Sequence, residues 1–342
     1  MLLTELHSTS CDASGIQLVY IVLEVLIAVA CCLGNLLVIW AVWTCGATRR
    51  QPTFRFIVSL AVADFLVGAV AVPLRILGDD RMEMSFHGCV AFCSVVIVLS
   101  QTSTFSQLAI AVDRFLRVAI PLRYKSTVTP QRCWWVVAAC WLFGAVVGFM
   151  PLMGWNNRAN LPHTNRTDCQ FLDVMSYSYL VNFNLYTCFV VPLLVMTVLY
   201  CSIFALVRRQ LRSPSLGTQS QSYFRKERKL TLSLVLVLVL FAVAWLPIQL
   251  MNMVTYYWGT SAVPHEAFYV GILLSQSNSA INPVIYALKI QQIRNAYKLL
   301  WRRVVLCRDE DETSSSRTPG TESSSNPKRH VETKTAETPL PD

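Results

Sequence analysis

Charged residues are scarce in this sequence. Lys, Arg, Asp and Glu make up 14% of its 342 residues, whereas hydrophobic residues make up 54%. A soluble domain carries about 25% charged residues, so this composition argues against a water-soluble fold. Metal-ligand spacing and a phosphate-binding loop are also missing, and the histidines are scattered at His7, His87, His163, His265 and His330. We therefore predict that the chain is not an enzyme and needs no organic cofactor.

Long apolar runs take the place of the missing charges. Seven occur, at 18–43, 54–77, 86–112, 133–155, 178–207, 230–258 and 266–288. A helix needs roughly 20 apolar residues to cross a bilayer. The ~10-residue alternating segments of a transmembrane barrel do not occur in the sequence. The pattern predicts an all-α membrane protein with a seven-helix bundle over residues 18–288, preceded by an N-terminal segment at 1–17.

Basic residues predict how this bundle lies in the membrane. They concentrate in the loops after the first, third, fifth and seventh runs, as in Arg208–Lys229, and such loops face the cytoplasm. Because residues 1–15 lack the basic start of a signal peptide, we expect the N-terminus outside the plasma membrane and the C-terminus inside. The net charge of +9 then reflects topology, and no nucleic-acid partner is expected. Asn165 begins a glycosylation sequon in a loop assigned to the outside.

Three of the cysteines lie on the predicted outer side, where an oxidising environment permits disulfides. Cys89 opens the third run and Cys169 lies in the second outer loop. We expect a disulfide between these two, so Cys11 has no predicted disulfide partner.

The C-terminal part contains two segments of different composition. Over 289–307, apolar residues recur at helical spacing between Lys and Arg residues, which predicts an amphipathic helix on the lipid of the inner leaflet. Cys307 ends this helix and is a candidate for palmitoylation. Residues 308–342 hold an acidic run and clusters of Ser and Thr, which predict a disordered tail open to phosphorylation.

A few polar residues interrupt the apolar runs, where they are costly and therefore functional candidates. They are Glu24, Asn35, Arg55, Asp64, Asp113, Arg114, Asn252, Asn278 and Asn282. Asp113 and Arg114 are expected to mark the point where the third helix meets the cytoplasm. A single Arg would suffice as such an anchor, so the pair indicates a further role.

These residues fall into motifs, about one for each helix. The motifs are Asn35 in GNLLV, Asp64 in SLAVAD, the Asp113–Arg114 pair, Trp141, Pro192 with Tyr200, Trp245 in FAVAWLP, and Asn278 to Tyr286 in NSAINPVIY. In this order they resemble the rhodopsin-like (class A) G-protein-coupled receptors over residues 18–305.

The resemblance implies a conformational switch. Arg114 would be held by Asp113 and, in the inactive state, by Glu227, until the sixth helix moves outward and a heterotrimeric G protein binds. Other members of the switch would be Tyr200, Asn282, Pro283 and Tyr286. Receptor kinases and arrestin would act on the tail.

Two ligand classes are excluded by this resemblance. Val96 stands where receptors for protonated amines usually hold an Asp, and Gln276 stands where opsins hold the Lys that binds retinal. Other stretches resemble the adenosine receptors, and these are residues 20–28, 56–64, 121–125, 154–156, 169–171 and 245–248 with Asn252.

The adenosine-receptor resemblance implies a set of ligand contacts. Phe171 would stack on adenine and Asn252 would hydrogen-bond its polar edge, because an aromatic face and an amide suit a flat purine. The apolar walls would be Val96, Ile97, Leu180, Ile248 and Ile272. The remaining contacts would be Ser100, Ser275 and Gln276 near the ribose, with Asn184, Trp245 and Glu24. A sodium ion would act as an allosteric modulator held by Asp64, Ser103, Asn278 and Ser279.

Some positions depart from the family pattern. Ser100 stands where most relatives have Thr and Gln276 where most have His, which puts the partnership of Gln276 with Glu24 in doubt. The third outer loop lacks a cysteine pair found in some subtypes, which favours the type-three adenosine receptor and an inhibitory G protein. Asn184 argues against that subtype.

The alternative is a receptor of the same fold for another small uncharged ligand, such as a lipid or a nucleotide derivative. Nucleotide phosphates would need basic residues near the pocket. Those available are Arg75, Arg81, Arg158 and Arg166.

Overall fold

The computed structural model describes residues 2–44, 51–79, 83–160, 167–212, 218–289, 293–295 and 297–298, with fewer of the side chains. These residues all belong to the first of two units, Met1–Leu300. Asn165, Cys307, the tail 308–342 and the side chain of Glu227 lie outside the described part, so the predictions made for them stay predictions.

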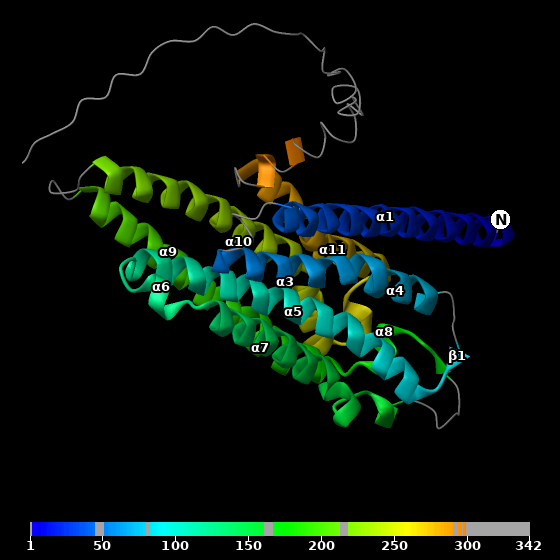
Figure 1. The fold of residues 1–342 in the computed structure, drawn as a ribbon. Coiled ribbons are helices and arrows are strands. Elements are labelled where there is room, and N and C mark those ends of the chain that lie inside the picture. The colour runs from blue at the N-terminus through cyan, green and yellow to red at the C-terminus, as the bar shows by residue number, and fades with distance from the viewer. Residues whose placement is uncertain are drawn as a thin grey trace, which may run out of the picture. The chain divides into compact units, whose positions relative to one another are not determined.

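Helices account for nearly all of the described residues (Figure 1). They are α1 (Leu2–Thr44), α3 (Pro52–Leu66), η1 (Val67–Ala71), α4 (Val72–Asp79), α5 (Phe86–Ala119), α6 (Tyr124–Thr127), α7 (Pro130–Phe149), η2 (Met150–Met153), η3 (Arg158–Asn160), α8 (Phe171–Val174), η4 (Tyr179–Val190), α9 (Val191–Arg212), α10 (Thr218–Trp258), η5 (Thr260–Ala262) and α11 (His265–Lys289). Two short strands, β1 (Glu83–Met84) and β2 (Thr167–Asp168), pair antiparallel.

Each predicted apolar run forms a helix in the structure. Six of the described helical stretches are long and apolar enough to cross a membrane. The seventh, α11, packs against α1 and α10 and is more polar than the others. It carries the amide and hydroxyl groups of Gln276, Asn278, Ser279 and Asn282.

Two helices begin where the sequence supplies a cap. Ser85 accepts a hydrogen bond from Gly88 N at 3.2 Å at the start of α5, and Thr129 accepts one from Arg132 N at 3.3 Å at the start of α7. Both hydroxyls satisfy a backbone N–H group in the first helical turn.

Two π-helical segments, η1 and η4, each end just before a proline. Pro73 and Pro192 have no backbone N–H, so neither can complete the regular bond to a carbonyl one turn earlier. The wider helical turn accommodates that missing donor. It changes the direction in which residues such as Val67 and Leu180 point, and both of these residues line the cavity described below.

Two helices are longer than the sequence predicted. Helix α1 begins at Leu2 rather than at residue 18, since residues 2–14 contain no proline to stop it. Helix α5 continues past residue 112 to Ala119. Asp113 and Arg114 therefore lie inside a helix and are buried, with exposed fractions of 2% and 6%.

Small residues allow the helices to approach closely. A Cβ added at Gly148 of α7 would lie 2.7 Å from the backbone nitrogen of Val98 in α5. A Cβ at Gly68 of η1 would lie 2.7 Å from the carbonyl oxygen of Ala28 in α1. Such contacts are typical of helix packing in membranes.

The outer faces of the bundle are apolar. Leu18, Leu142 and Val198 each expose 63% of their surface, and many large hydrophobic residues are similarly exposed. A soluble monomer rarely presents apolar surface on this scale. With the six apolar spans, this surface indicates a multi-pass membrane protein.

Candidate functional site

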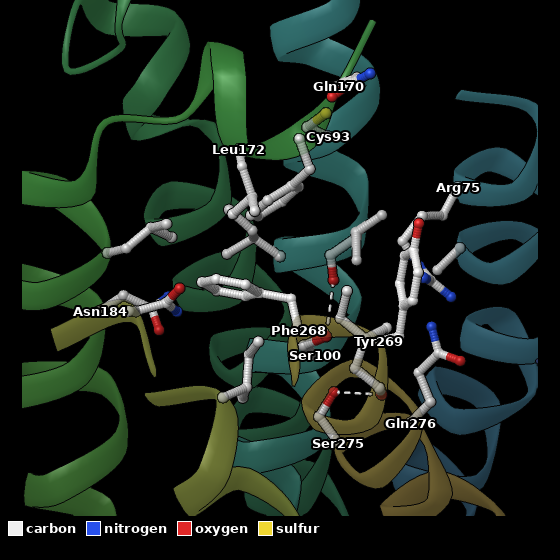
Figure 2. Close-up of a pocket in the computed structure, with 18 of the residues that line it drawn as sticks. Arg75, Cys93, Ser100, Gln170, Leu172, Asn184, Phe268, Tyr269, Ser275 and Gln276 are labelled. Atoms are coloured by element: carbon white, nitrogen blue, oxygen red, sulfur yellow. Dashed lines mark hydrogen bonds between the residues drawn. The ribbon is translucent and has the colours of Figure 1, made fainter. Parts of the chain in front are cut away.

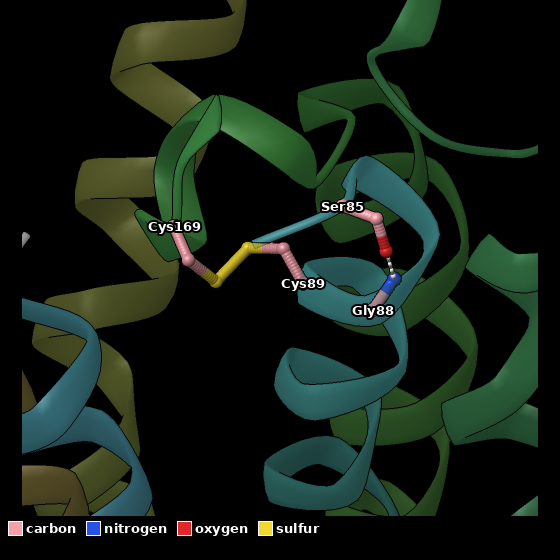
Figure 3. Close-up of a disulfide and its surroundings, with 4 residues drawn as sticks. All are labelled: Ser85, Gly88, Cys89 and Cys169. Atoms are coloured by element: carbon pink, nitrogen blue, oxygen red, sulfur yellow. Dashed lines mark hydrogen bonds between the residues drawn. A yellow bond between two sulfur atoms is a disulfide. The ribbon is translucent and has the colours of Figure 1, made fainter. Parts of the chain in front are cut away.

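A disulfide fixes the segment before α8 over the start of α5. Cys89 and Cys169 are bonded, as predicted, and the two Cα atoms are 5.5 Å apart (Figure 3). Strand β2 lies directly before Cys169 and β1 lies shortly before Cys89, and the two strands pair with Glu83 opposite Asp168. Phe171 is therefore held above the bundle by two independent constraints.

Below this segment lies a cavity of about 1000 Å³. It is lined by residues from α4, α5, α8, η4, α10 and α11, among others (Figure 2). This volume lies at the upper end of the range for small-molecule pockets. The cavity is therefore large enough to enclose a nucleoside-sized molecule.

All but one of the predicted ligand contacts line this cavity. They are Val96, Ile97, Ser100, Phe171, Leu180, Asn184, Trp245, Ile248, Asn252, Ile272, Ser275 and Gln276. The structure thus brings together residues spread over about 180 positions of sequence, although their role in binding stays a prediction.

Several polar atoms in the cavity wall have no partner among the described residues. The side-chain oxygens of Asn252 and Gln249 and the indole nitrogen of Trp245 are buried without a hydrogen bond. Gln249 reaches Asn184 Oδ1 only at 3.5 Å. Buried polar groups are normally paired, so this wall offers acceptors and a donor to a bound molecule.

The predicted ribose contacts are positioned by their own helices. Ser100 Oγ donates to the carbonyl oxygen of Val96 at 2.9 Å, and Ser275 Oγ donates to that of Ile272 at 2.8 Å, as Figure 2 shows. Each hydroxyl keeps free lone pairs for a ligand donor.

Glu24 is the predicted contact that does not line the cavity. It is fully buried in α1 and forms an ion pair with Arg75 of α4, and Arg75 lines the cavity in its place. The partnership of Gln276 with Glu24, which the sequence puts in doubt, gives way to a guanidinium that contacts both residues. Arg75 is a charged residue inside the predicted run 54–77, and that position alone could have singled it out.

Two of the predicted sodium ligands, Ser103 and Ser279, bond directly to a third, Asp64. Asp64 Oδ1 accepts from Ser103 Oγ at 2.9 Å and from Ser279 Oγ at 2.8 Å. Its Oδ2 accepts from Asn282 Nδ2 at 2.8 Å. Asn282, which is not among the predicted sodium ligands, thus also bonds to Asp64. The role of Asn278 as a sodium ligand stays a prediction, and its side chain lines the cavity together with Ser103 and Ser279.

Asp113 lies in a second buried network at the other end of α5. Its Oδ2 accepts from Thr53 Oγ1 at 2.5 Å and its Oδ1 from the Tyr124 hydroxyl at 2.6 Å. Arg117 donates to both of these partners, at 3.0 and 3.1 Å. Burial and the Asp113 carboxylate raise the pKa of Tyr124 to about 12.

Two of the other predicted switch residues lie near Arg114. Tyr200 of α9 and Tyr286 of α11 are buried within electrostatic range of its guanidinium. Pro283 packs against α1, where a Cβ added at Gly34 would lie 3.0 Å from its ring. The restraint of Arg114 by Asp113 and Glu227 stays a prediction.

Comparison with known proteins agrees with this architecture. Residues 34–286 match the family model of the seven-transmembrane receptors of the rhodopsin family. The chain is 38% identical to adenosine receptor A3 of Canis lupus familiaris over 87% of its own length and 95% of that protein. It is 37% identical to adenosine receptor A3 of Ovis aries over 92% of its length and 98% of that protein. The chain therefore belongs to the rhodopsin family of seven-transmembrane receptors, which are not enzymes, and within that family to the adenosine receptors.

Proposed function

We propose that the cavity binds adenosine and that binding activates a heterotrimeric G protein of the inhibitory class. The observation that carries the adenosine assignment is the buried amide oxygen of Asn252, which has no hydrogen-bond partner in a cavity also lined by the Phe171 ring. An adenine could stack on the ring and donate from its exocyclic amine to that oxygen. The names of the two relatives support the same ligand.

The orientation in the membrane is part of this proposal. The disulfide and the cavity lie at one end of the bundle, and the basic segments 114–132 and 208–229 fall in the sequence around the opposite ends of α5, α7, α9 and α10. The excess of Lys and Arg in those loops supports a cavity that opens to the outside of the plasma membrane and a G-protein surface in the cytoplasm.

Asn252→Ala tests the ligand. Adenosine affinity should fall by about 1–3 kcal/mol, because the adenine edge would lose its partner. Displacement of a radioligand by adenosine on membranes measures the change. Asn182→Ala is the matched control, because Asn182 is exposed and donates to Tyr256 rather than lining the cavity. Unchanged adenosine affinity in Asn252→Ala would exclude the purine assignment.

The inhibitory class rests on the likeness to type-three receptors. Adenosine should lower cyclic AMP in cells that express the wild-type chain and stimulated adenylate cyclase. A rise in cyclic AMP would contradict the inhibitory class and leave the ligand assignment intact.

A sodium ion is the proposed modulator at Asp64. The carboxylate and the hydroxyls of Ser103 and Ser279 converge there, and hydroxyls can turn their lone pairs toward a cation. Oxygen donors of this kind suit a hard ion. Bound there, the ion would neutralise a charge buried between α3, α5 and α11.

A further inference from the structure

An ion pair closes one end of the cavity. Arg75 donates to Glu24 Oε1 and to the Tyr20 hydroxyl, and its guanidinium carbon lies 5.7 Å from the centre of the Tyr20 ring. The Glu24 side chain is 0% exposed and the Arg75 side chain 11%. Two charges this deeply buried are stable only together.

The two charges of the ion pair lie at different distances from the cavity. Arg75 lines the cavity and Glu24 does not, so a ligand meets the guanidinium first and the carboxylate lies behind it. Arg keeps its charge at any physiological pH and has donors only. This end of the cavity therefore presents the cationic, hydrogen-bond-donating side of the ion pair to a ligand.

Gln276 extends the same donor-rich end. Figure 2 places Arg75, Tyr269 and Gln276 on one side of the cavity and Asn184 on the other. In Figure 2 the amide nitrogen of Gln276 points toward Arg75. Rotation of the amide group by half a turn about its last side-chain bond places the amide oxygen there instead. That oxygen then accepts from Arg75 Nε at 3.1 Å. Because a guanidinium can only donate, the half-turned orientation is the bonded one.

Apart from Glu24, the described neighbours of Arg75 at this end of the cavity are mainly aromatic rings. The Tyr20 and Tyr269 rings stack with their centres 4.2 Å apart, and His265 meets Tyr269 edge-on at 5.1 Å. Asp173 also lines the cavity. It is exposed, however, so its charge is screened by solvent and salt.

We propose that Arg75 determines ligand specificity: it makes this end of the cavity favour purine nucleosides whose ribose carries an anionic or hydrogen-bond-accepting group over those that carry an ammonium group. The inference rests on the proposed function, since it takes adenosine as the parent ligand. It goes beyond that function because it assigns a charge preference to a residue outside the purine contacts.

The test compares ligands that differ only in charge. Adenosine analogues with a carboxylate, a neutral carboxamide or a protonated amine, prepared in one series at C5′ and another at C3′, compete for a radioligand at neutral pH. On the wild-type chain, one of the two series should bind in the order carboxylate, carboxamide, amine, with steps on the order of tenfold.

The variants must not leave a buried charge alone. Glu24→Gln with Arg75→Gln removes both charges and keeps polar groups of similar size, so it should fold and should lose the charge order while adenosine still binds. Arg75→Lys should keep the order.

The outcomes separate the two proposals. If the double variant keeps the wild-type charge order, or if neither series shows that order on the wild-type chain although adenosine binds, Arg75 does not set specificity and the proposed function stands. If adenosine fails to bind the wild-type chain, both proposals are wrong.

Discussion

The hydroxyl of Tyr124 donates to the Asp113 carboxylate at 2.6 Å, from a four-residue helix outside the membrane spans into the buried end of α5. The same hydroxyl accepts from Arg117, whose guanidinium carbon lies 4.8 Å from the centre of the Tyr124 ring. These hydrogen bonds hold α6 against Asp113, the acidic residue of the Asp113–Arg114 motif. A loop residue thus helps to hold the most polar part of the predicted switch.

Tyr124→Phe should destabilise the receptor by about 1–3 kcal/mol, since it leaves a buried carboxylate oxygen without its donor. Thermal unfolding in detergent measures the loss. Tyr257→Phe is the control, because Tyr257 is 56% exposed and surface substitutions change stability by about 0.5 kcal/mol or less. Equal melting temperatures for wild type and Tyr124→Phe would show that the hydrogen bond contributes nothing.

The same bond predicts a pH dependence with a definite sign. The Tyr124 pKa is raised from 10 to about 12, chiefly by burial. A raised pKa gives stability that is fully present below the unfolded value and is lost as the pH rises through the folded value. The stability gap between wild type and Tyr124→Phe should therefore be constant below pH 10 and shrink toward pH 12. A gap that shrinks below pH 9 would point to a different titrating group.

Gly148→Ala should prevent close packing of α7 on α5. The added Cβ would lie 2.7 Å from Val98 N and 2.9 Å from Val98 Cα, so backbone must move. Overpacking of this kind costs about 1–3 kcal/mol, and surface expression and melting temperature should both fall. Gly15→Ala is the control, because a Cβ there has nothing within 4 Å. Wild-type behaviour of Gly148→Ala would mean that the helices can separate freely.

The sequence predicted the helices well because lipid leaves the backbone few alternatives. Each apolar run became a helix, and Cys89 and Cys169 were found bonded. The start of α1 at Leu2 was missed, since a polar segment without proline can continue a helix as readily as leave it.

Pairings across helices were harder to predict. The sequence placed Glu24 in the ligand set and Asn278 beside Asp64, yet Arg75 covers Glu24 and Asn282 reaches Asp64. Which of two polar residues on one helix faces a partner depends on helix rotation. The π-helical turn before Pro73 changes that rotation for Arg75, and no sequence pattern marked this turn.

The effect of sodium on agonist affinity should depend on Asp64 and the hydroxyl groups that bond to it. Ser279→Ala removes one oxygen and should weaken the effect of sodium on agonist affinity, and Asp64→Asn should abolish it. Ser277→Ala is the control, because the Ser277 hydroxyl bonds to the carbonyl oxygen of Leu274 at 2.6 Å instead. Agonist displacement at several sodium concentrations, with ionic strength held constant, measures the effect. An undiminished sodium effect in Asp64→Asn would place the ion elsewhere.

Glu227→Ala should raise basal G-protein activation. Glu227 lies one helical turn before Thr231 in α10, and Thr231 is only 2% exposed. The family resemblance predicts that the Glu227 carboxylate restrains Arg114. If a carboxylate there holds Arg114 in the inactive state, removing it shifts the two-state population toward the active one. A shift of about 1 kcal/mol would raise basal activity roughly fivefold.

Arg228→Ala is the neighbouring control, because Arg228 is exposed and lies over the Phe204 ring at 5.9 Å, so its loss should leave basal activity unchanged. Nucleotide exchange without agonist, at matched surface expression, measures the basal activation. If Glu227→Ala and Arg228→Ala give the same basal rate as wild type, Glu227 is a solvated charge and the restraint on Arg114 lies elsewhere.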